Sequence, residues 1–581
     1  MKNKYKTIAA LVATVATAFV FSACGNGSGS QHNYVDEVVP PTCTEAGYTL
    51  HKCTDEGCDF SYTDTEVKAL GHSYIDYFCE RCGVLDEDAP VTDGLEYMPV
   101  YAEDGTTVTS YAVSGVGSSQ IGGYLKISGT HSEEGVGAKS VVGIADAAFK
   151  DINSVKAIVL PSSCKTIGDG AFEGCTALES IVLPSACQEI GVGAFKGCTA
   201  VGDITFGNGL KTVREDAFEG CTALKSVALP SGVTLIERNA FGGCAALASA
   251  ELPMAMGKTV VELDADTDEE KEKIERLHFG YIFGAATYEQ NIQAVPSALK
   301  SVGIVGSLPV PENAFYGCAI ESVDIVGAQE IGDGAFNGCS SLTDVSIGTG
   351  VSSIGDGAFR DCVKLSGLTV ASGLGAIGDG AFENCVLFAE VSLPDSINSI
   401  GKGVFEGCTG MISVTMPFSF GASSDEKYFG YIFGAESYSQ NGASVPATLK
   451  SVHITGANPV TAHAFGGCAA IENVRIGASV KNVGASAFEN CAGLKNVVLE
   501  TGLVAIGDKA FDNCSALAEL TLGSGIKSVG SGAFGGCASL KTVRYNGTVA
   551  EFGATKYADK YSSPLAYEAA LYINGHRVKY S

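Results

Sequence analysis

The chain has 581 residues, a formal net charge of −28 and a hydrophobic fraction of 46%, so most of it is expected to fold around an apolar core. A surface with this excess of carboxylates repels phosphate groups, which argues against nucleic-acid binding and against adsorption on anionic lipid. Glycine is abundant at 74 residues, cysteine occurs 21 times and tryptophan is absent.

The N-terminus has the features of a secretion signal. Three lysines in MKNKYK precede an apolar run over residues 8–21, which is too short to span a bilayer comfortably. The run ends in Phe-Ser-Ala-Cys, which resembles the lipobox of bacterial lipoproteins, with Phe21 in place of the usual Leu. The resemblance implies that residues 1–23 are a lipoprotein signal peptide, that Cys24 is lipidated, and that the Gly/Ser-rich residues 24–31 form a flexible tether. An ordinary cleaved signal peptide is the alternative.

Residues 32–90 differ in composition from the rest and hold five cysteines. A structural Zn²⁺ takes four thiolate or imidazole ligands in a tetrahedron, and two closely spaced cysteine pairs can supply them. The other two interpretations are disulfides, which would leave one of the five cysteines unpaired, and free thiols. The first candidate ligand set, with nearly zinc-ribbon spacing, is Cys53, Cys58, Cys79 and Cys82, and the alternative set is Cys43, Cys53, Cys58 and His72.

The segments that flank the main part of the chain have β-type patterns. Residues 91–139 contain TTVTSYAV and GGYLKIS, which predict a β-rich N-terminal cap. Residues 546–581 contain NGTVAEFGATKY and LYINGHRVKY, which predict a C-terminal cap of irregular structure. Caps are expected because a stack of repeats exposes strand edges at both ends.

Between residues 140 and 545 the chain repeats one unit. Fourteen copies are centred on a phenylalanine, most of them 23 residues apart, and thirteen carry a cysteine three residues after it. Since no enzyme needs thirteen nucleophiles at one spacing, we expect these cysteines, and also Cys164 and Cys187, to be small buried residues. The fourteen phenylalanines are Phe149, Phe172, Phe195, Phe218, Phe241, Phe315, Phe336, Phe359, Phe382, Phe405, Phe465, Phe488, Phe511 and Phe534.

Each unit has the pattern of one coil. Apolar residues recur eight and five residues before the phenylalanine and six residues after it. Ile181 and Leu183 then alternate with Ser180 and Val182, and this period of two predicts a short strand. A single coil cannot bury its own apolar face, whereas stacked coils bury a continuous one.

The pattern L-P-x-x-V-x-x-I-G-x-x-A-F-x-G-C-x-x-L-x-x-V resembles the BspA-like class of leucine-rich repeats. The resemblance implies an α/β solenoid, a right-handed stack of 23-residue coils, preceded by the Cys-rich module and closed by the β caps. Such repeats occur on bacterial surface proteins that bind host or matrix proteins and neighbouring cells. The fold alone does not identify the partner.

Two related insertions interrupt the repeats, near residues 254–298 and 418–448. Both contain FGYIFGA, and the strand-like phrases that follow, LKSVGI and LKSVHI, keep the spacing of a regular coil. We therefore expect the stack to continue through both insertions, to reach about sixteen coils, and to carry them on its convex or lateral side. Their aromatic residues either pack a local mini-core or form an exposed binding patch with Tyr281 and Tyr431 as anchors.

The sequence offers no catalytic constellation, so we expect a non-enzymatic binding protein. At about 4.8 Å per strand, sixteen coils would present a polar stripe about 75 Å long, suited to an extended ligand held at many weak points. The outward-facing residues of the strands are candidate binding residues, and the alternative is that each is only a solvated strand position. The chief candidates are Asp203, Thr205, Asp344, Ser346, Thr369, Arg475 and Arg544.

These observations predict a lipid-anchored protein at the bacterial cell surface, which meets the membrane through its N-terminal lipid only and binds no nucleic acid. The expected partner is an extracellular protein or glycan, and the expected activity is adhesion to host, matrix or neighbouring cells. The alternative function is that of a zinc-binding extracytoplasmic lipoprotein whose active element is the Cys-rich module. Beyond a structural zinc ion, we expect no cofactor.

Overall fold

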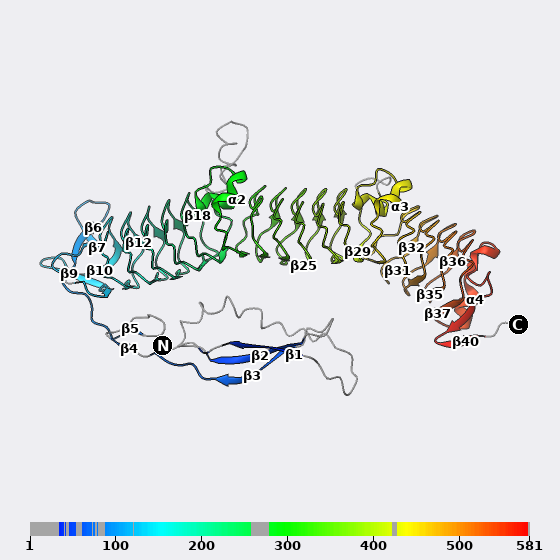
Figure 1. The fold of residues 1–581 in the computed structure, drawn as a ribbon, viewed down its shortest axis with the longest axis horizontal. Coiled ribbons are helices and arrows are strands. Elements are labelled where there is room, and N and C mark those ends of the chain that lie inside the picture. The colour runs from blue at the N-terminus through cyan, green and yellow to red at the C-terminus, as the bar shows by residue number, and fades with distance from the viewer. Residues whose placement is uncertain are drawn as a thin grey trace.

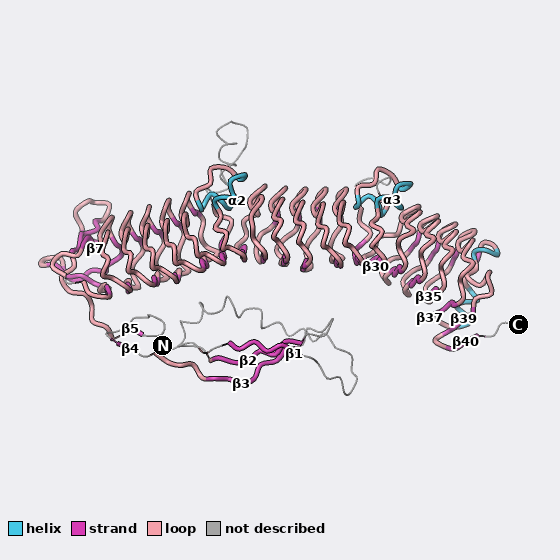
Figure 2. The backbone as a smooth tube through the Cα atoms, in the orientation of Figure 1, coloured by secondary structure: helices cyan, strands magenta, loops and turns pink. Residues whose placement is uncertain are grey.

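The computed structural model describes residues 34–39, 41, 46–53, 61–72, 74–75, 78–79, 88–119, 121–256, 278–420 and 427–578. The main body is an elongated, gently arched stack of about sixteen coils of about 23 residues (Figure 1). The stack confirms the predicted solenoid. Each coil contains two short strands joined by turns, with little helix (Figure 2), so the structure is a β-solenoid and the helical part of the expected α/β class is nearly absent from the described residues.

One strand of every coil lies in a parallel arrangement whose outer surface we call the strand face. Neighbouring strands pair in register, so that Ile158, Ile181 and Ile204 are partners in successive coils. The hydrogen bonding runs in three segments, β8 to β15, β17 to β25 and β27 to β39. The strands are β8 (Tyr124–Lys126), β11 (Ala157–Val159), β13 (Ser180–Val182), β15 (Asp203–Thr205), β17 (Ser226–Ala228), β19 (Ser249–Leu252), β20 (Ser301–Ile304), β21 (Ser322–Ile325), β23 (Asp344–Ile347), β25 (Gly367–Val370), β27 (Glu390–Ser392), β29 (Ser413–Pro417), β30 (Ser451–Thr455), β31 (Asn473–Ile476), β33 (Asn496–Leu499), β35 (Glu519–Gly523), β37 (Thr542–Asn546) and β39 (Ala570–Ile573).

A second parallel sheet of mostly two-residue strands follows another side of the coils. In the coils beside the insertions it is reduced to single bridges at Met256, Val310, Phe420 and Val460. Its strands are β10 (Gly137–Ile144), β12 (Thr166–Ile167), β14 (Glu189–Ile190), β16 (Thr212–Val213), β18 (Leu235–Ile236), β22 (Glu330–Ile331), β24 (Ser353–Ile354), β26 (Ala376–Ile377), β28 (Ser399–Ile400), β32 (Asn482–Val483), β34 (Ala505–Ile506), β36 (Ser528–Val529) and β38 (Lys556–Tyr557).

The third side of the coil is the turn that contains the repeated phenylalanine. The Phe172 N–H donates to the Ala194 carbonyl of the next coil over 2.7 Å, and the rings of Phe172 and Phe195 stack with centroids 5.3 Å apart. Two residues of this turn, Gly170 and Gly174 in the second complete coil, have φ values of +59° and +74°. Because left-handed residues interrupt a right-handed helix, this side of the coil forms turns rather than helix.

The stack continues through both insertions, as predicted. Strand β19 pairs directly with β20, and β29 pairs directly with β30, across the inserted residues. The insertions project from the edge opposite β25 and β31 (Figure 1), which agrees with the expected convex or lateral position. Their helices are η3 (Phe279–Phe283), η4 (Tyr288–Gln290) and α2 (Asn291–Ala294) in the first insertion, and η6 (Phe429–Phe433), η7 (Tyr438–Gln440) and α3 (Asn441–Ser444) in the second.

Antiparallel strands cover both ends of the stack. At the N-terminal end, β6 (Glu96–Tyr101) and β7 (Val108–Gly115) extend the second sheet beyond β10, which also pairs with β9 (Thr130–Glu133). At the C-terminal end the stack runs past residue 545, because Leu571 and Ile573 of β39 occupy the buried strand positions and β38 adds to the second sheet. This end also contains α4 (Val549–Ala554), η8 (Lys560–Ser562) and β40 (His576–Val578).

The Cys-rich module contains two small antiparallel sheets. Strands β1 (Tyr34–Val39), β2 (Gly47–Cys53) and β3 (Ser61–Val67) form one, and β4 (Tyr74–Ile75) pairs with β5 (Phe78–Cys79). Across the described part of the chain, the helices are all too short or too polar to cross a membrane.

Candidate binding surface

The strand face combines a buried apolar layer with an outward layer of polar side chains. In β23, Val345 and Ile347 are buried, while Asp344 is exposed and Ser346 is half-buried. The parallel register places Ser346 beside Thr369 of β25. The period of two found in the sequence therefore produces columns of outward side chains that run along the stack.

The predicted residues fall into separate groups on this face. Asp344, Ser346 and Thr369 lie on the neighbouring strands β23 and β25, whereas Asp203 and Thr205 lie on β15 in another segment of the sheet. Arg475 on β31 and Arg544 on β37 are both exposed and belong to one column near the C-terminal end. The structure thus brings the candidates onto one face but does not gather them into one pocket.

Several of these side chains have unused hydrogen-bonding capacity. Within the described part of the chain, no side-chain hydrogen bond is formed by Asp203, Ser346 or Thr369. Arg544 makes only long contacts: its Nε lies 4.0 Å from a carboxylate oxygen of Glu519, and its guanidinium lies 5.5 Å from the ring centroid of Tyr572. Exposed pairs of this kind contribute little to stability, so these side chains are available to a ligand.

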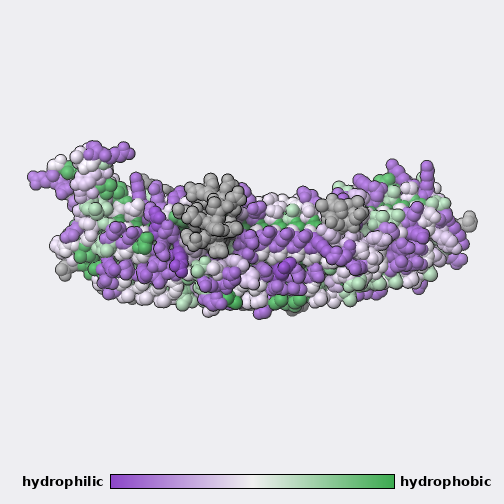
Figure 3. Space-filling view, turned by 90° about the horizontal axis from the view of Figure 1, so that it is seen from above, coloured by the Kyte–Doolittle hydropathy of each residue, from purple (hydrophilic) through white to green (hydrophobic). Residues whose placement is uncertain are grey.

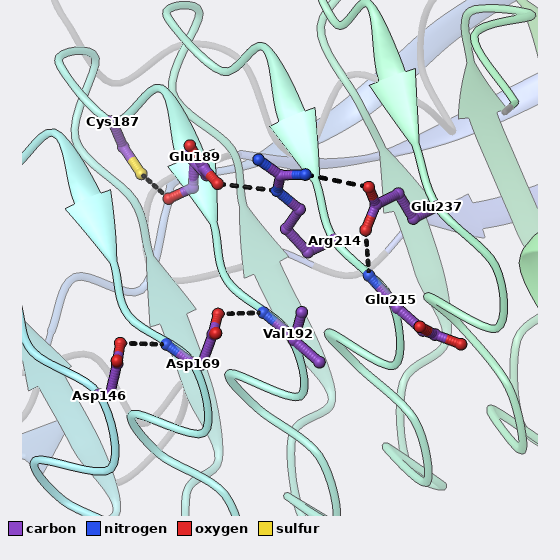
Figure 4. Close-up of polar contacts among 8 residues, drawn as sticks. All are labelled: Asp146, Asp169, Cys187, Glu189, Val192, Arg214, Glu215 and Glu237. Carbon is purple, nitrogen blue, oxygen red and sulfur yellow. Dashed lines mark hydrogen bonds and ion pairs between the residues drawn. The ribbon is translucent and has the colours of Figure 1, made fainter. Parts of the chain in front are cut away.

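Several polar side chains at the second sheet bind neighbouring coils (Figure 4). Asp169 Oδ1 accepts the backbone N–H of Val192 over 2.8 Å, and the Arg214 guanidinium lies between Glu189 and Glu237 at 2.8 and 3.0 Å. The aspartate that recurs in the Ile-Gly-Asp-Gly phrase therefore has a structural role, because its carboxylate bonds one coil to the next. These contacts join successive coils in this part of the second sheet.

Charge is distributed unevenly along the strand face. In the column that contains Ser346, the outward positions of β19 and β21 hold Glu251 and Asp324, and burial and the nearby Asp324 raise the pKa of Glu251. The same column holds His453, Arg475 and Arg544 in β30, β31 and β37. On a chain of net charge −28, this C-terminal stretch is the part of the strand face best suited to an anionic group.

A shallow hollow of about 230 Å³ lies on the strand face between β29 and β33. Arg475, predicted from the sequence, lines it together with His453, which the sequence analysis did not single out. The signal was available, because the phrase LKSVHI places His453 at an outward strand position.

The aromatic residues of the insertions mostly pack inward. Phe279, Phe283, Phe429 and Phe433 are buried, and the Phe279 and Phe315 ring centroids are 4.6 Å apart, so the insertion continues the phenylalanine stack. The mini-core interpretation is confirmed for these four phenylalanines. The edge that carries the insertions, seen from above in Figure 3, is mainly hydrophilic with small separate apolar patches.

Tyr281 and Tyr431, the predicted anchors, are half-buried against the same core. Their backbone carbonyls accept the N–H groups of Asn239 and Gly403 in the preceding coils, at 2.9 Å each. They belong to η3 and η6 and therefore lie on the insertion edge rather than on the strand face. A binding role for them remains a prediction.

The repeat cysteines are buried structural residues, as predicted. All thirteen are free and buried, and so are Cys164 and Cys187. Burial raises the pKa of Cys175 to about 11 and that of Cys164 to about 12, so these thiols stay protonated and unreactive at neutral pH.

The cysteines of the lipidation and zinc predictions have no described side chains. Cys24, Cys43, Cys58 and Cys82 lie outside the described residues, and only the backbone is described for Cys53 and Cys79. His72 of the alternative zinc set is described and exposed. Among the described side chains, no group of three or more His, Cys, Asp or Glu residues could hold a metal ion.

Comparison with known proteins identifies the repeat. A family model described as the BspA type leucine rich repeat region matches six copies over residues 138–259, 309–430 and 446–563. No curated protein sequence matches the chain.

Three solved structures illustrate the similarity. A leucine-rich repeat protein from Bacteroides ovatus is 22% identical, covering 83% of this chain and 99% of its own, with a TM-score of 0.30. A leucine rich cell surface protein from Faecalibacterium prausnitzii is 18% identical, covering 81% and 98%, with a TM-score of 0.28. The pneumococcal vaccine antigen PcpA is 19% identical, covering 67% and 93%, with a TM-score of 0.26.

Proposed function

This chain belongs to the BspA-type leucine-rich-repeat family, and we propose that it is a non-enzymatic cell-surface protein that binds an extracellular protein or glycan through its strand face. The observation that carries the proposal is the row of outward polar side chains with unused hydrogen-bonding capacity, exemplified by Asp203, Ser346 and Thr369. At the second sheet, by contrast, Asp169 and Arg214 bond to neighbouring coils.

Repetition makes such a surface effective despite weak individual contacts. Successive strands present equivalent positions, as the register of Ser346 with Thr369 shows. A ligand that touches several of them gains avidity because each contact raises the effective concentration at the next. We propose adhesion to host, matrix or neighbouring cells as the activity, with the chain held at the cell surface by a lipid on Cys24.

Site-specific photocrosslinking of the full chain tests the strand face. A photoreactive amino acid at Thr369, which is exposed on β25, should crosslink a component of an extracellular-matrix extract or of a bacterial surface fraction. The same group at Lys364, which is exposed in the turn of the same coil, is the matched control and should capture much less. Equal capture at both positions, or capture at Lys364 alone, would contradict a strand-face site.

A second candidate function, zinc binding by the Cys-rich module, is favoured by the positions of two cysteines. Cys53 is the last residue of β2 and Cys79 is the last residue of β5, so each candidate ligand pair begins where an antiparallel strand ends. Closely spaced ligand pairs at strand ends are suited to a tetrahedral Zn²⁺ site.

Metal analysis of the full chain tests the zinc candidate. The purified protein should contain about one zinc ion per chain, and replacement of both Cys79 and Cys82 with serine should remove it. Unchanged zinc content, or none in the parent protein, would contradict this function. The crosslinking result at Thr369 is independent of either outcome.

A further inference from the structure

The hollow between β29 and β33 has a continuous row of hydroxyl and amide groups along one side. The row consists of Ser413, Ser451, Asn473 and Asn496, one from each of four successive strands. Asn496 Nδ2 donates to Asn473 Oδ1 over 2.8 Å, and Asn473 Nδ2 donates to Ser451 Oγ over 3.3 Å. Each of these groups can both donate and accept, and the chain of bonds holds the two amides in place.

The other side of the hollow carries a positioned cation. Arg475 Nε donates to Glu500 Oε1 over 2.7 Å, and Glu500 Oε2 accepts the backbone N–H of Ala478 over 3.0 Å. Glu500 is thus fixed to the backbone and holds one edge of the guanidinium. Because a guanidinium has five N–H donors in a planar fork, the remaining edge of Arg475, which lines the hollow, can donate to a carboxylate.

His453 lies next to Arg475 and adds a group that changes charge with pH. Partial burial lowers the pKa of His453, and the neighbouring Arg475 lowers it further, while Glu500 and Asp395 act in the opposite direction. The imidazole is therefore neutral at neutral pH. A bound anion would favour its protonated form, so binding and protonation would support each other on mild acidification.

We propose that this hollow binds a saccharide that carries a carboxylate, of the uronic-acid class. The inference rests on the proposed function, and it assigns a ligand class to one section of the strand face. Arg475 holds the carboxylate, and the row from Ser413 to Asn496 binds the ring hydroxyls.

The shape and chemistry favour a sugar over an acidic peptide. The volume of about 230 Å³ is below that of pockets for drug-sized ligands, and it suits one ring at a time. Sugar hydroxyls match a row of groups that both donate and accept, whereas a glutamate side chain would use the guanidinium and leave the row unoccupied. A peptide that binds by adding a strand needs a free sheet edge, and the centre of a paired sheet offers none.

Calorimetry with trigalacturonate and the full chain tests the proposal, with the methyl ester of the same trisaccharide as the neutral comparison. The acid form should bind more tightly than the ester, by about tenfold. Arg475→Gln should remove this preference while leaving the melting temperature unchanged, because Arg475 is exposed. Lys527→Gln, which removes an exposed positive charge next to β36 of the second sheet and outside the hollow, is the control and should bind as the parent does.

The pH dependence separates the role of His453 from that of Arg475. Binding of the acid form should tighten by about fivefold between pH 7.5 and pH 5.5, where the uronate stays ionised, and His453→Asn should abolish this change. Equal affinity for acid and ester, equal losses in the Arg475 and Lys527 variants, or equally tight binding of hexaglutamate would overturn the proposal. If the calorimetry contradicts the uronate site but Thr369 still crosslinks specifically, the strand face binds a different ligand. If Thr369 does not crosslink specifically, the proposed function itself is contradicted.

Discussion

The thiol of Cys198 donates a hydrogen bond to the backbone carbonyl of Phe172 in the preceding coil, over 3.1 Å. That carbonyl also accepts the N–H of Cys175 in its own coil, over 3.2 Å. Eleven of the thirteen repeat cysteines form the equivalent bond, and the two others, Cys318 and Cys468, directly follow the insertions. Cysteine is thus small enough for the corner and also carries a donor, a combination that alanine lacks.

We expect the fifteen described cysteines to resist thiol reagents in the folded protein. Burial keeps them protonated, and it raises the pKa of Cys198 to about 12, whereas the reactive species is the thiolate. Alkylation followed by mass spectrometry should label none of the fifteen in the native state and all of them after denaturation. Disulfides among these positions would contradict the structure.

Replacement of Phe359 with alanine should destabilise its coil by about 3–5 kcal/mol. The ring is fully buried and stacks between Phe336 and Phe382, at centroid distances of 5.0 and 5.2 Å. Since coils contact only their neighbours, hydrogen exchange should rise first in the two adjacent coils. Lys364→Ala, an exposed substitution in the same coil, is the control and should leave exchange unchanged.

The double replacement of Tyr281 and Tyr431 with alanine should lower the melting temperature. Both side chains pack against the core beside buried phenylalanines, so their removal loses apolar contacts. We expect binding per folded molecule to stay intact. The opposite result, unchanged melting with binding weakened by more than about 1 kcal/mol per site, would show that these tyrosines are anchors.

The first insertion should lose stability on mild acidification because of His278. Its Nδ1 bonds to Asn291 Oδ1 at 2.8 Å, its Nε2 is buried and has no hydrogen-bond partner among the described residues, and burial lowers its pKa. In the unfolded state this histidine has a pKa of about 6.5, so below that pH the unfolded state binds a proton more readily than the folded state does. The stability that the neutral histidine contributes is therefore complete above a pH of about 6.5, and it is lost as the pH falls toward the lower pKa of the folded state. Protection factors for residues 279–294 should therefore fall from pH 7.5 to pH 5.5.

The second insertion supplies the control for this effect. Tyr428 occupies the equivalent position, and its hydroxyl donates to the Ala435 carbonyl over 2.9 Å. His278→Tyr should make the first insertion as insensitive to pH as residues 429–444. A pH dependence that persists in this variant would assign the effect to another group, such as the nearby Glu289.

Cys24→Ala should move the protein from the membrane fraction into the medium or leave it unprocessed. The expectation follows from the lipobox-like FSAC and the Gly/Ser-rich residues after it. Fractionation followed by immunoblotting checks the outcome, and Ser22→Ala, which keeps the cysteine, is a suitable control. Unchanged processing together with membrane retention would indicate another anchor.

The repeat, its period and its buried columns follow from the amino-acid sequence alone. A stack of similar coils buries the same positions in every coil. The recurrence of residues such as Phe359 and Cys362 at a fixed spacing therefore predicts that they are buried. The outward positions of the strands were also predictable, because a period of two assigns each side chain to one face. The same reasoning predicted that β19 would meet β20 across the first insertion.

The sequence pattern does not reveal which outward side chains form hydrogen bonds between coils and which form none, because those bonds depend on the three-dimensional packing of the coils. Asp169 and Thr369 are both polar residues of the repeated unit. The Asp169 carboxylate accepts a hydrogen bond from the next coil, whereas the Thr369 side chain forms no hydrogen bond within the described residues. The stacking of coils brings Glu500 to Arg475, 25 positions earlier, and to the backbone of Ala478, 22 positions earlier. These contacts depend on the local shape of each coil. A periodic pattern contains no such distances, so the hollow beside His453 and the thiol bonds to backbone carbonyls became visible only in three dimensions.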